Sequence, residues 1–331
     1  MANAPSSNTR IRRAATSPAI AAMRTSNLTL SFVTAALVWT LLCIWPVSGA
    51  AQDLTPRAYW PSPKGTRVAV LGYSRAEGDV LFDPSIPLYG VDSELNVAIL
   101  AYMQTLGLWG RTANLIVELP YQWGTTQGFI GTTPAGRRYD GIGDLGVTLS
   151  VNLLGAPSMS VEDFQAMRAD PRHLLGASLK VIAPTGKYDS DRILNIGANR
   201  WSAKAELGYM FPIRNKVIFE MNLGAWFFGN DDSFIGGRRR QHPIVAAKLH
   251  LVRRFSPGFW ASLDATYFEG GRQIIGGNEL GDVQQNARLG ATISVPIRGR
   301  HSVKIGYAAG VVTEFGTDFN QFLVTYQVLL N

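Results

Sequence analysis

Charged side chains recur at alternate positions within apolar segments of this sequence, and they are its candidates for chemistry. Because apolar side chains fall on one face of each segment, the charged ones share the other face. If the apolar face meets lipid, the charged face lines an interior that orders water and steers polar or zwitterionic solutes. The alternative is that these charges pair across a filled interior and brace it. The candidate lining residues are Glu118, Lys180, Lys204, Glu206, Glu220, Lys248, His250, Asp264, Arg288 and Lys304, with Asp144 as one more inward acid.

A second group of charges lies in the longer connections between these segments. The basic runs suit binding of lipopolysaccharide phosphates or recruitment of anionic solutes, although a solvated loop explains them equally well. The acidic pair lacks the full spacing of a calcium loop and is more typical of a turn. The candidate outer-loop contacts are Asp231, Asp232, Arg238, Arg239 and Arg240.

No arrangement of residues in the sequence indicates an enzyme, a cofactor or a metal site. The histidines form no repeated pairing with serine on one strand face, and the G-x-S-x-G turn of serine hydrolases is missing. Ala183–Lys187 resembles half of a phosphate-binding loop, but Val181 replaces its first glycine and Tyr188 its Ser/Thr. We therefore expect no catalysis and no cofactor, and an outer-membrane hydrolase is the last of the alternatives.

The elements that must position these residues are strands, because the apolar pattern has a period of two. In Trp201–Phe211 the odd-numbered positions are almost all apolar, and the even-numbered ones include Lys204 and Glu206. Asp144–Leu153 alternates in the same way. Such segments of about ten residues are typical of transmembrane β-strands. They are expected at residues 65–75, 93–104, 112–124, 143–154, 174–185, 201–211, 217–228, 243–254, 259–269, 284–296, 302–313 and 321–331.

The connections between the expected strands alternate between short and long. Short ones such as 212–216 and 255–258 alternate with long ones at 125–142, 186–200, 229–242 and 270–283. This alternation predicts a closed antiparallel transmembrane β-barrel of about twelve strands, all-β, with short turns at the periplasmic rim. A soluble β-sandwich is the alternative, but charges within the strands would be costly in its packed core. The connection 155–172 is expected to hold one short periplasmic helix at Ser160–Arg168.

The N-terminal region reads as a targeting segment. Leu28–Trp45 is apolar or hydroxylic and follows four arginines, and small residues after it predict cleavage near Ala50 or Ala51. A single membrane anchor is the alternative, and either Met1 or Met23 could be the start. The expected organisation is an N-terminal extension and signal peptide at 1–51, a short periplasmic segment at 52–64, and a barrel at 65–331.

Charge and composition narrow the function classes further. The chain is 46% hydrophobic, which is low for a helical membrane protein, and its net charge of +7 falls to +3 without the four arginines of residues 1–51. Such a mild excess does not indicate a nucleic-acid partner. The single cysteine, Cys43, lies in the signal segment, so the mature chain is expected to fold without disulfides.

Several motifs resemble the outer-membrane transporter family named after the meta-pathway of phenol degradation. The most distinctive are Asn195–Trp201 (NIGANRW) and Gly229–Asp232 (GNDD), and the similarity covers roughly 65–331. The resemblance implies an outer-membrane barrel that passes small molecules, including aromatic or hydrophobic ones. One departure is the final residue, Asn331, where many such barrels end in Phe; the last strand still alternates, so we expect recognition by the outer-membrane assembly machinery.

These observations predict a passive channel for small solutes in the outer membrane of a Gram-negative bacterium. Its expected partners are membrane lipid, lipopolysaccharide, the assembly machinery and the solutes themselves. A closed structural or ligand-binding barrel is the alternative. Inward glycines such as Gly208 and Gly306 leave space, which favours the channel. Whether residues 52–64 hang free or enter the interior is left open by the sequence.

Overall fold

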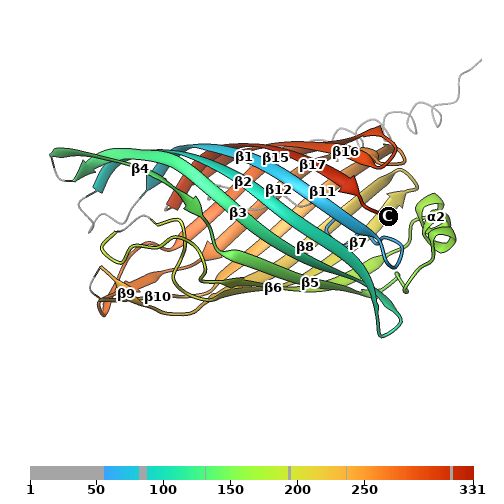
Figure 1. Cartoon of the computed structure of the whole chain (residues 1–331), viewed down its shortest axis with the longest axis horizontal. Coiled ribbons are helices and arrows are strands. Elements are labelled where there is room, and N and C mark those ends of the chain that lie inside the picture. The colour runs from blue at the N-terminus through green and yellow to red at the C-terminus, as the bar shows by residue number, and fades with distance from the viewer. Residues whose placement is uncertain (1–55, 82–87, 131, 193–194, 236, 314–315) are drawn as a thin grey trace, which may run out of the picture. The chain divides into compact units, whose positions relative to one another are not determined.

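A computed structural model describes residues 56–331 except 82–87, 131, 193–194, 236 and 314–315. The expected signal segment therefore lies outside the described residues. One large antiparallel sheet dominates the described part (Figure 1). Its strands are β1 (Arg67–Leu81), β2 (Leu88–Leu108), β3 (Arg111–Ile130), β4 (Thr133–Ile142), β5 (Leu145–Leu154), β6 (Leu174–Ala183), β7 (Ser202–Arg214), β8 (Val217–Phe228), β11 (Ile244–Ser256), β12 (Phe259–Gly270), β15 (Gln284–Arg298), β16 (His301–Thr313) and β17 (Gly316–Leu329).

The sheet closes on itself, because the first and last strands pair. β1 runs antiparallel to β17, with Val68 opposite Leu329, and its other edge pairs with β2. β4 and β5 pair with successive parts of β3, so they share one position in the wall. The 13 strands of the sheet thus form a barrel of twelve positions, and the prediction of a closed all-β barrel is confirmed.

The alternation seen in the sequence separates the two faces of the wall. Leu207 on β7 and Leu263 on β12 point outward and are 55% and 66% exposed. Their neighbours Glu206 and Asp264 point inward and are buried. An exposed apolar exterior around a polar interior is what a lipid-facing wall requires, because lipid offers no partner for charge. A soluble sandwich would have the opposite arrangement.

Three expected loops contain more strand than the sequence indicates. The expected loop at 125–142 is wrong, because β3 and β4 continue as a paired hairpin from Tyr121–Ile142 to Ile130–Thr133. Its residues are largely polar on both faces, so they carry no apolar alternation. The loops at 229–242 and 270–283 contain β9 (Asp231–Phe234), β10 (Gly237–Gln241), β13 (Gln273–Ile275) and β14 (Asn278–Glu279), which form a separate four-stranded sheet.

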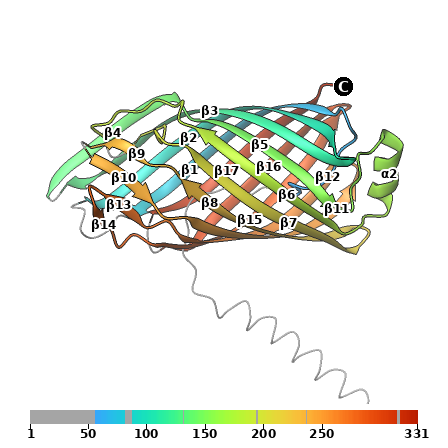
Figure 2. The ribbon, with the colours of Figure 1, turned by 90° about the horizontal axis from the view of Figure 1, so that it is seen from below.

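The helix α2 (Val161–Ala169) forms where it was expected. Ser160 caps it, and the Asp163 side chain accepts a hydrogen bond from the Ser160 amide in return. Figures 1 and 2 show α2 at the opposite end of the barrel from β9, β10 and the hairpin of β4. The α2 end also carries short turns, such as the one at Trp109–Gly110 between β2 and β3, so we call it the periplasmic end. None of the described helices is long and apolar enough to cross a membrane.

Candidate functional site

The interior of the barrel holds the predicted charged residues at two levels of burial. Wall strands hold them there because inward positions alternate with the outward apolar ones. Seven are buried: Lys204, Glu206, Glu220, Lys248, His250, Asp264 and Arg288. Three are half-buried: Glu118, Lys180 and Lys304. Their part in lining a conducting pore stays a prediction.

Most of these charges interact with one another, within a strand or across the inner face of the wall. Glu206 pairs with Lys204 on its own strand and lies 3.4 Å from the ammonium of Lys248 on β11. Lys180 on β6 pairs with Glu118 on β3. Pairing of this kind lowers the cost of holding charge away from water. The interior is therefore a braced polar network in which neither sign is left in large excess.

A second buried network centres on the carboxylate of Asp264. One of its oxygens lies 2.7 Å from Nδ1 of His250, and the other accepts hydrogen bonds from Ser262 and Thr292 at 3.1 and 2.8 Å. His250 also lies directly opposite Glu220 on β8. Ser262 thus donates to the acid and not to the imidazole, which is unlike the Ser–His contact of a serine hydrolase.

Residues 56–66, which we call the N-terminal segment, enter the barrel from the periplasmic end. The Tyr59 hydroxyl lies 2.9 Å from Ser178 Oγ and 3.3 Å from a carboxylate oxygen of Glu206. The Tyr59 carbonyl accepts a hydrogen bond of 3.2 Å from the Asn152 amide. The segment is therefore held by side chains of three different wall strands, β5, β6 and β7.

The ring of Tyr59 fits against two glycines on the inner wall. A Cβ on Gly176 or on Gly208 would lie 2.1 Å from an atom of this ring. The expectation that inward glycines leave open space is therefore wrong at Gly208, because Tyr59 occupies that space. Contacts such as Tyr59 with Glu206, 147 residues apart, leave no local pattern in a sequence. The one available signal was the aromatic pair Tyr59-Trp60 in a segment expected to be periplasmic.

Arg57, two residues before Tyr59, makes a second attachment. Its backbone amide donates a hydrogen bond of 2.6 Å to Glu220. Its guanidinium lies over the rings of Trp60 and Trp260, at 4.4 and 5.3 Å from their centroids. Glu220 was predicted as a lining residue, and the structure shows that one of its oxygens is engaged by the N-terminal segment.

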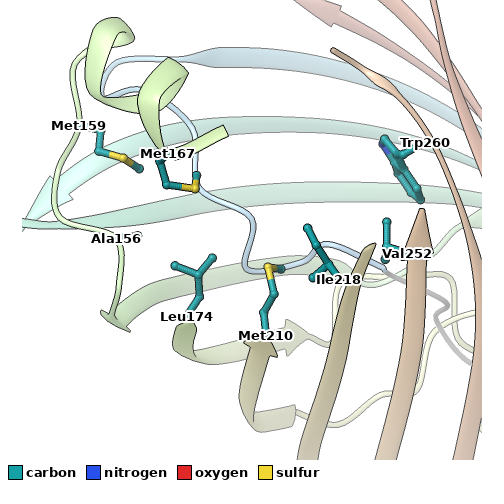
Figure 3. Close-up of a cluster of buried hydrophobic side chains, with 8 residues drawn as sticks. All are labelled: Ala156, Met159, Met167, Leu174, Met210, Ile218, Val252 and Trp260. Carbon is teal, nitrogen blue, oxygen red and sulfur yellow. The ribbon is translucent and has the colours of Figure 1, made fainter. Parts of the chain in front are cut away.

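At the periplasmic end of the interior, apolar side chains form a buried cluster, which we call the apolar floor. Figure 3 shows residues from the wall strands meeting residues next to or on α2. Trp60 and Phe164 pack against the cluster, so the N-terminal segment and α2 both contribute to it. The floor consists of Ala156, Met159, Met167, Leu174, Met210, Ile218, Val252 and Trp260.

At the outer end, the motif residues of the loops form a hydrogen-bonded network around Asp231. The buried Asp231 carboxylate accepts hydrogen bonds from Tyr188 at 2.7 Å and Asn199 at 2.9 Å, and Arg239 lies 3.4 Å away. Burial raises the pKa of Asp231, but these hydrogen bonds outweigh burial and hold the pKa below its usual value. Burial and the contact with Asp231 raise the pKa of Tyr188 to about 12.

The predicted outer-loop contacts divide into two groups. Asp231 is fully buried, so its expected role as a surface contact is wrong: it holds the loops together. Arg239 is half-buried and is part of the same network. Asp232, Arg238 and Arg240 are exposed, and the first two form an ion pair. Asp144, expected to point inward, instead accepts backbone hydrogen bonds from Gly186 and Ala198 and anchors this loop.

A closed barrel with an apolar exterior, a charged interior and long loops at one rim is the architecture of outer-membrane β-barrel proteins. The sequence matches the family described as "Putative MetA-pathway of phenol degradation" over residues 75–317. The chain belongs to this family, and the predicted resemblance is confirmed. No relative among curated proteins matches the chain.

Three solved structures illustrate the structural similarity. The crystal structure of the COG4313 outer membrane channel from Pseudomonas putida F1 has a TM-score of 0.69 at 20% identity, covering 84% of this chain and 100% of that one. The transport unit of the autotransporter AIDA-I from Escherichia coli has a TM-score of 0.48 at 13% identity, with 85% and 93% covered. The Ralstonia pickettii toluene transporter TbuX has a TM-score of 0.40 at 8% identity, with 86% and 96% covered. At 20% identity the first supports the barrel fold alone.

Proposed function

We propose that the protein is a passive channel for small solutes in the outer membrane of a Gram-negative bacterium. The observation that carries the proposal is the charged interior of a closed, lipid-compatible barrel. A barrel that served only as a scaffold could fill its interior with apolar side chains, whereas Lys204, Lys248 and Glu206 keep it polar. The name of the similar barrel, an outer membrane channel, supports the same function.

The periplasmic end sets the condition under which the channel conducts. The N-terminal segment and the apolar floor lie in series below the charged interior, so conduction requires at least partial release of both. Apolar constrictions exclude water until they widen, and such constrictions gate other channels. The protein therefore works as a channel that is closed in the described conformation and opens when the segment moves.

Conductance across a planar bilayer tests the proposal. The protein, purified from outer membranes, is expected to give discrete steps, and Lys204→Gln should shift the reversal potential toward cation preference because the interior loses a cation. Lys216→Gln, in a periplasmic turn, is the matched control and should behave like the unmodified protein. A barrel that inserts correctly but never conducts, even after deletion of residues 56–63, would contradict the proposal.

A closed, ligand-binding barrel is the second candidate, and the apolar floor favours it. Ala156, Leu174, Ile218 and Val252 are fully buried there, as in the core of a sealed domain. Catalysis has less support, because in the described residues Ser262 contacts the acid of the Asp264–His250 pair and not its imidazole. Contacts with lipopolysaccharide through Arg238 and Arg240, and folding by the outer-membrane assembly machinery, are parts of the proposal that rest on exposure and on the barrel architecture.

A further inference from the structure

The outer half of the interior contains an aromatic and apolar cluster next to a buried arginine. Ile244, Ala246 and Phe268 are buried, and Trp226 and Phe228 pack against them. The rings of Trp226 and Phe228 stack, with their planes 8° apart. These residues lie near the outer ends of β8, β11 and β12. Flat apolar walls of this kind suit a planar aromatic ring.

Arg200 lies over this cluster with part of its hydrogen-bonding capacity unused. Its guanidinium carbon lies 4.7 Å from the centroid of Phe228, and the residue is only 7% exposed. One nitrogen donates to Gln241, but Nε and Nη1 have no partner among the described residues. Buried guanidinium groups normally pair with a carboxylate, and no described carboxylate forms an ion pair with Arg200.

Two further buried donors in this region also have no partner among the described residues. The indole N–H of Trp226 and Nε of Arg239 have no acceptor in the described part of the chain. The nearby acceptors are already engaged, since Asp231 accepts from Tyr188 and Asn199, and Gln241 accepts from Arg200. What this region lacks is therefore an acceptor, and next to a cation the acceptor of choice is an anion.

Arg200 keeps its charge under ordinary conditions. Burial lowers the pKa of Arg200 to about 10, and the neighbouring charge of Arg239 acts in the same direction, while Asp231 offsets part of this shift. At neutral pH the guanidinium is therefore still protonated. Lys204 adds a second cation on the inner side, 5.8 Å from the Trp226 ring.

We infer that Arg200, Trp226 and Phe228 form a binding site for planar aromatic carboxylates in the outer part of the barrel. The carboxylate binds the free edge of the Arg200 guanidinium, and the ring packs against Trp226 and Phe228. The inference rests on the proposed function, which it deepens by naming a class of solute. Neutral aromatic molecules satisfy only the apolar half of the site, and small aliphatic anions only the charged half.

Equilibrium dialysis of the purified protein with benzoate tests the site. Benzyl alcohol, which keeps the ring without the charge, and cyclohexanecarboxylate, which keeps the charge without the flat ring, are the matched probes. Benzoate is expected to bind at least tenfold more tightly than either. Arg200→Gln should weaken benzoate binding at least tenfold without changing the affinity for benzyl alcohol. Arg272→Gln, which replaces an exposed arginine paired with Glu279, should change neither affinity.

Further outcomes separate this inference from the channel proposal. Phe228→Leu should lower the preference for benzoate over cyclohexanecarboxylate. This variant tests the site independently if Arg200→Gln does not fold. Equal affinity for benzoate and benzyl alcohol, or unchanged benzoate binding in a folded Arg200→Gln protein, would overturn the site. Conductance without benzoate binding would overturn only the site, whereas benzoate binding without conductance in any variant would keep the site and overturn the channel.

Discussion

Tyr59 attaches the N-terminal segment to the inner wall most directly. Its ring lies between Gly176 and Gly208, and its hydroxyl reaches Ser178 and Glu206. Because no side chain separates the ring from the wall, the fit requires glycine at both positions. A single methyl group placed there tests whether the N-terminal segment is held by this contact.

We predict that Gly208→Ala displaces the N-terminal segment from the wall. The added Cβ would lie 2.1 Å from the Tyr59 ring, so the ring must leave or shift. Loss of a buried aromatic contact costs about 3 kcal/mol or more. Trypsin cleavage after Arg57, which burial of the segment should slow in the unmodified protein, should then become faster. Gly306→Ala is the control, since its Cβ would meet nothing closer than 3.6 Å, and an unchanged cleavage rate in Gly208→Ala would contradict the prediction.

Asp231 gives a pH dependence to the outer loops. Its pKa is lowered in the folded protein, so the carboxylate stabilises the loops above its usual pKa of about 4, and this contribution is lost as the pH falls through the lowered value. Asp231→Asn should therefore speed amide hydrogen exchange in residues 195–201 at pH 6. The difference between variant and unmodified protein should shrink in strong acid, and Asp232→Asn should show neither effect. A difference that persists unchanged below pH 3 would rule out the carboxylate as its cause.

At the scale of the strand, the two faces of β5 make a direct test of orientation. Leu149 points outward and is 37% exposed, while its neighbour Thr148 points inward and is half-buried. Leu149→Arg places a charge in lipid at a cost of about 2–4 kcal/mol near the midplane. Thr148→Arg places the same charge in the polar interior and should cost much less.

Urea unfolding of the two variants in lipid vesicles measures this difference. The heat-modifiable gel shift of a folded barrel shows beforehand that each variant has inserted. The expected result is a lower unfolding midpoint for Leu149→Arg alone. Equal midpoints would mean that the lipid-facing and interior-facing assignments of β5 are wrong.

The elements differ in how far the sequence predicts them. Trp201–Phe211 is recognisable because alternation reports which face meets lipid, and β7 covers nearly the same residues. The hairpin of β3 and β4 cannot be recognised in this way, because both faces of its outer part meet water and the apolar alternation disappears. Inward positions such as Glu206 can be predicted from the alternation along a strand. Their partners cannot be predicted, because the pairing of Glu206 with Lys248 depends on strand order and register around the barrel.

At the scale of the whole molecule, the interior is arranged in layers along the barrel. The loop network of Asp231 lies outermost, followed by the cluster at Trp226, the charged zone around Glu206, and the N-terminal segment above the apolar floor. The last two layers could not be predicted, because they join chain segments more than 100 residues apart, as Arg57 and Glu220 illustrate. From the outside inward, polar layers therefore alternate with apolar ones, and the apolar floor comes last.

Under the proposed channel function, the N-terminal segment and the apolar floor are expected to act as two resistances in series, and each should limit conductance by itself. Deletion of residues 56–63 removes Tyr59 and Trp60 but leaves Met167 and Phe164 of α2 over the periplasmic end. Single-channel recordings should show a small increase for this deletion, a small increase for the double substitution Phe164→Ala and Met167→Ala, and a larger increase than their sum when the changes are combined. Series resistances explain this excess, because removing one barrier exposes the other as the limiting step. Full conductance after the deletion alone would show that the floor is no barrier, and the layered description of the periplasmic end would then be wrong.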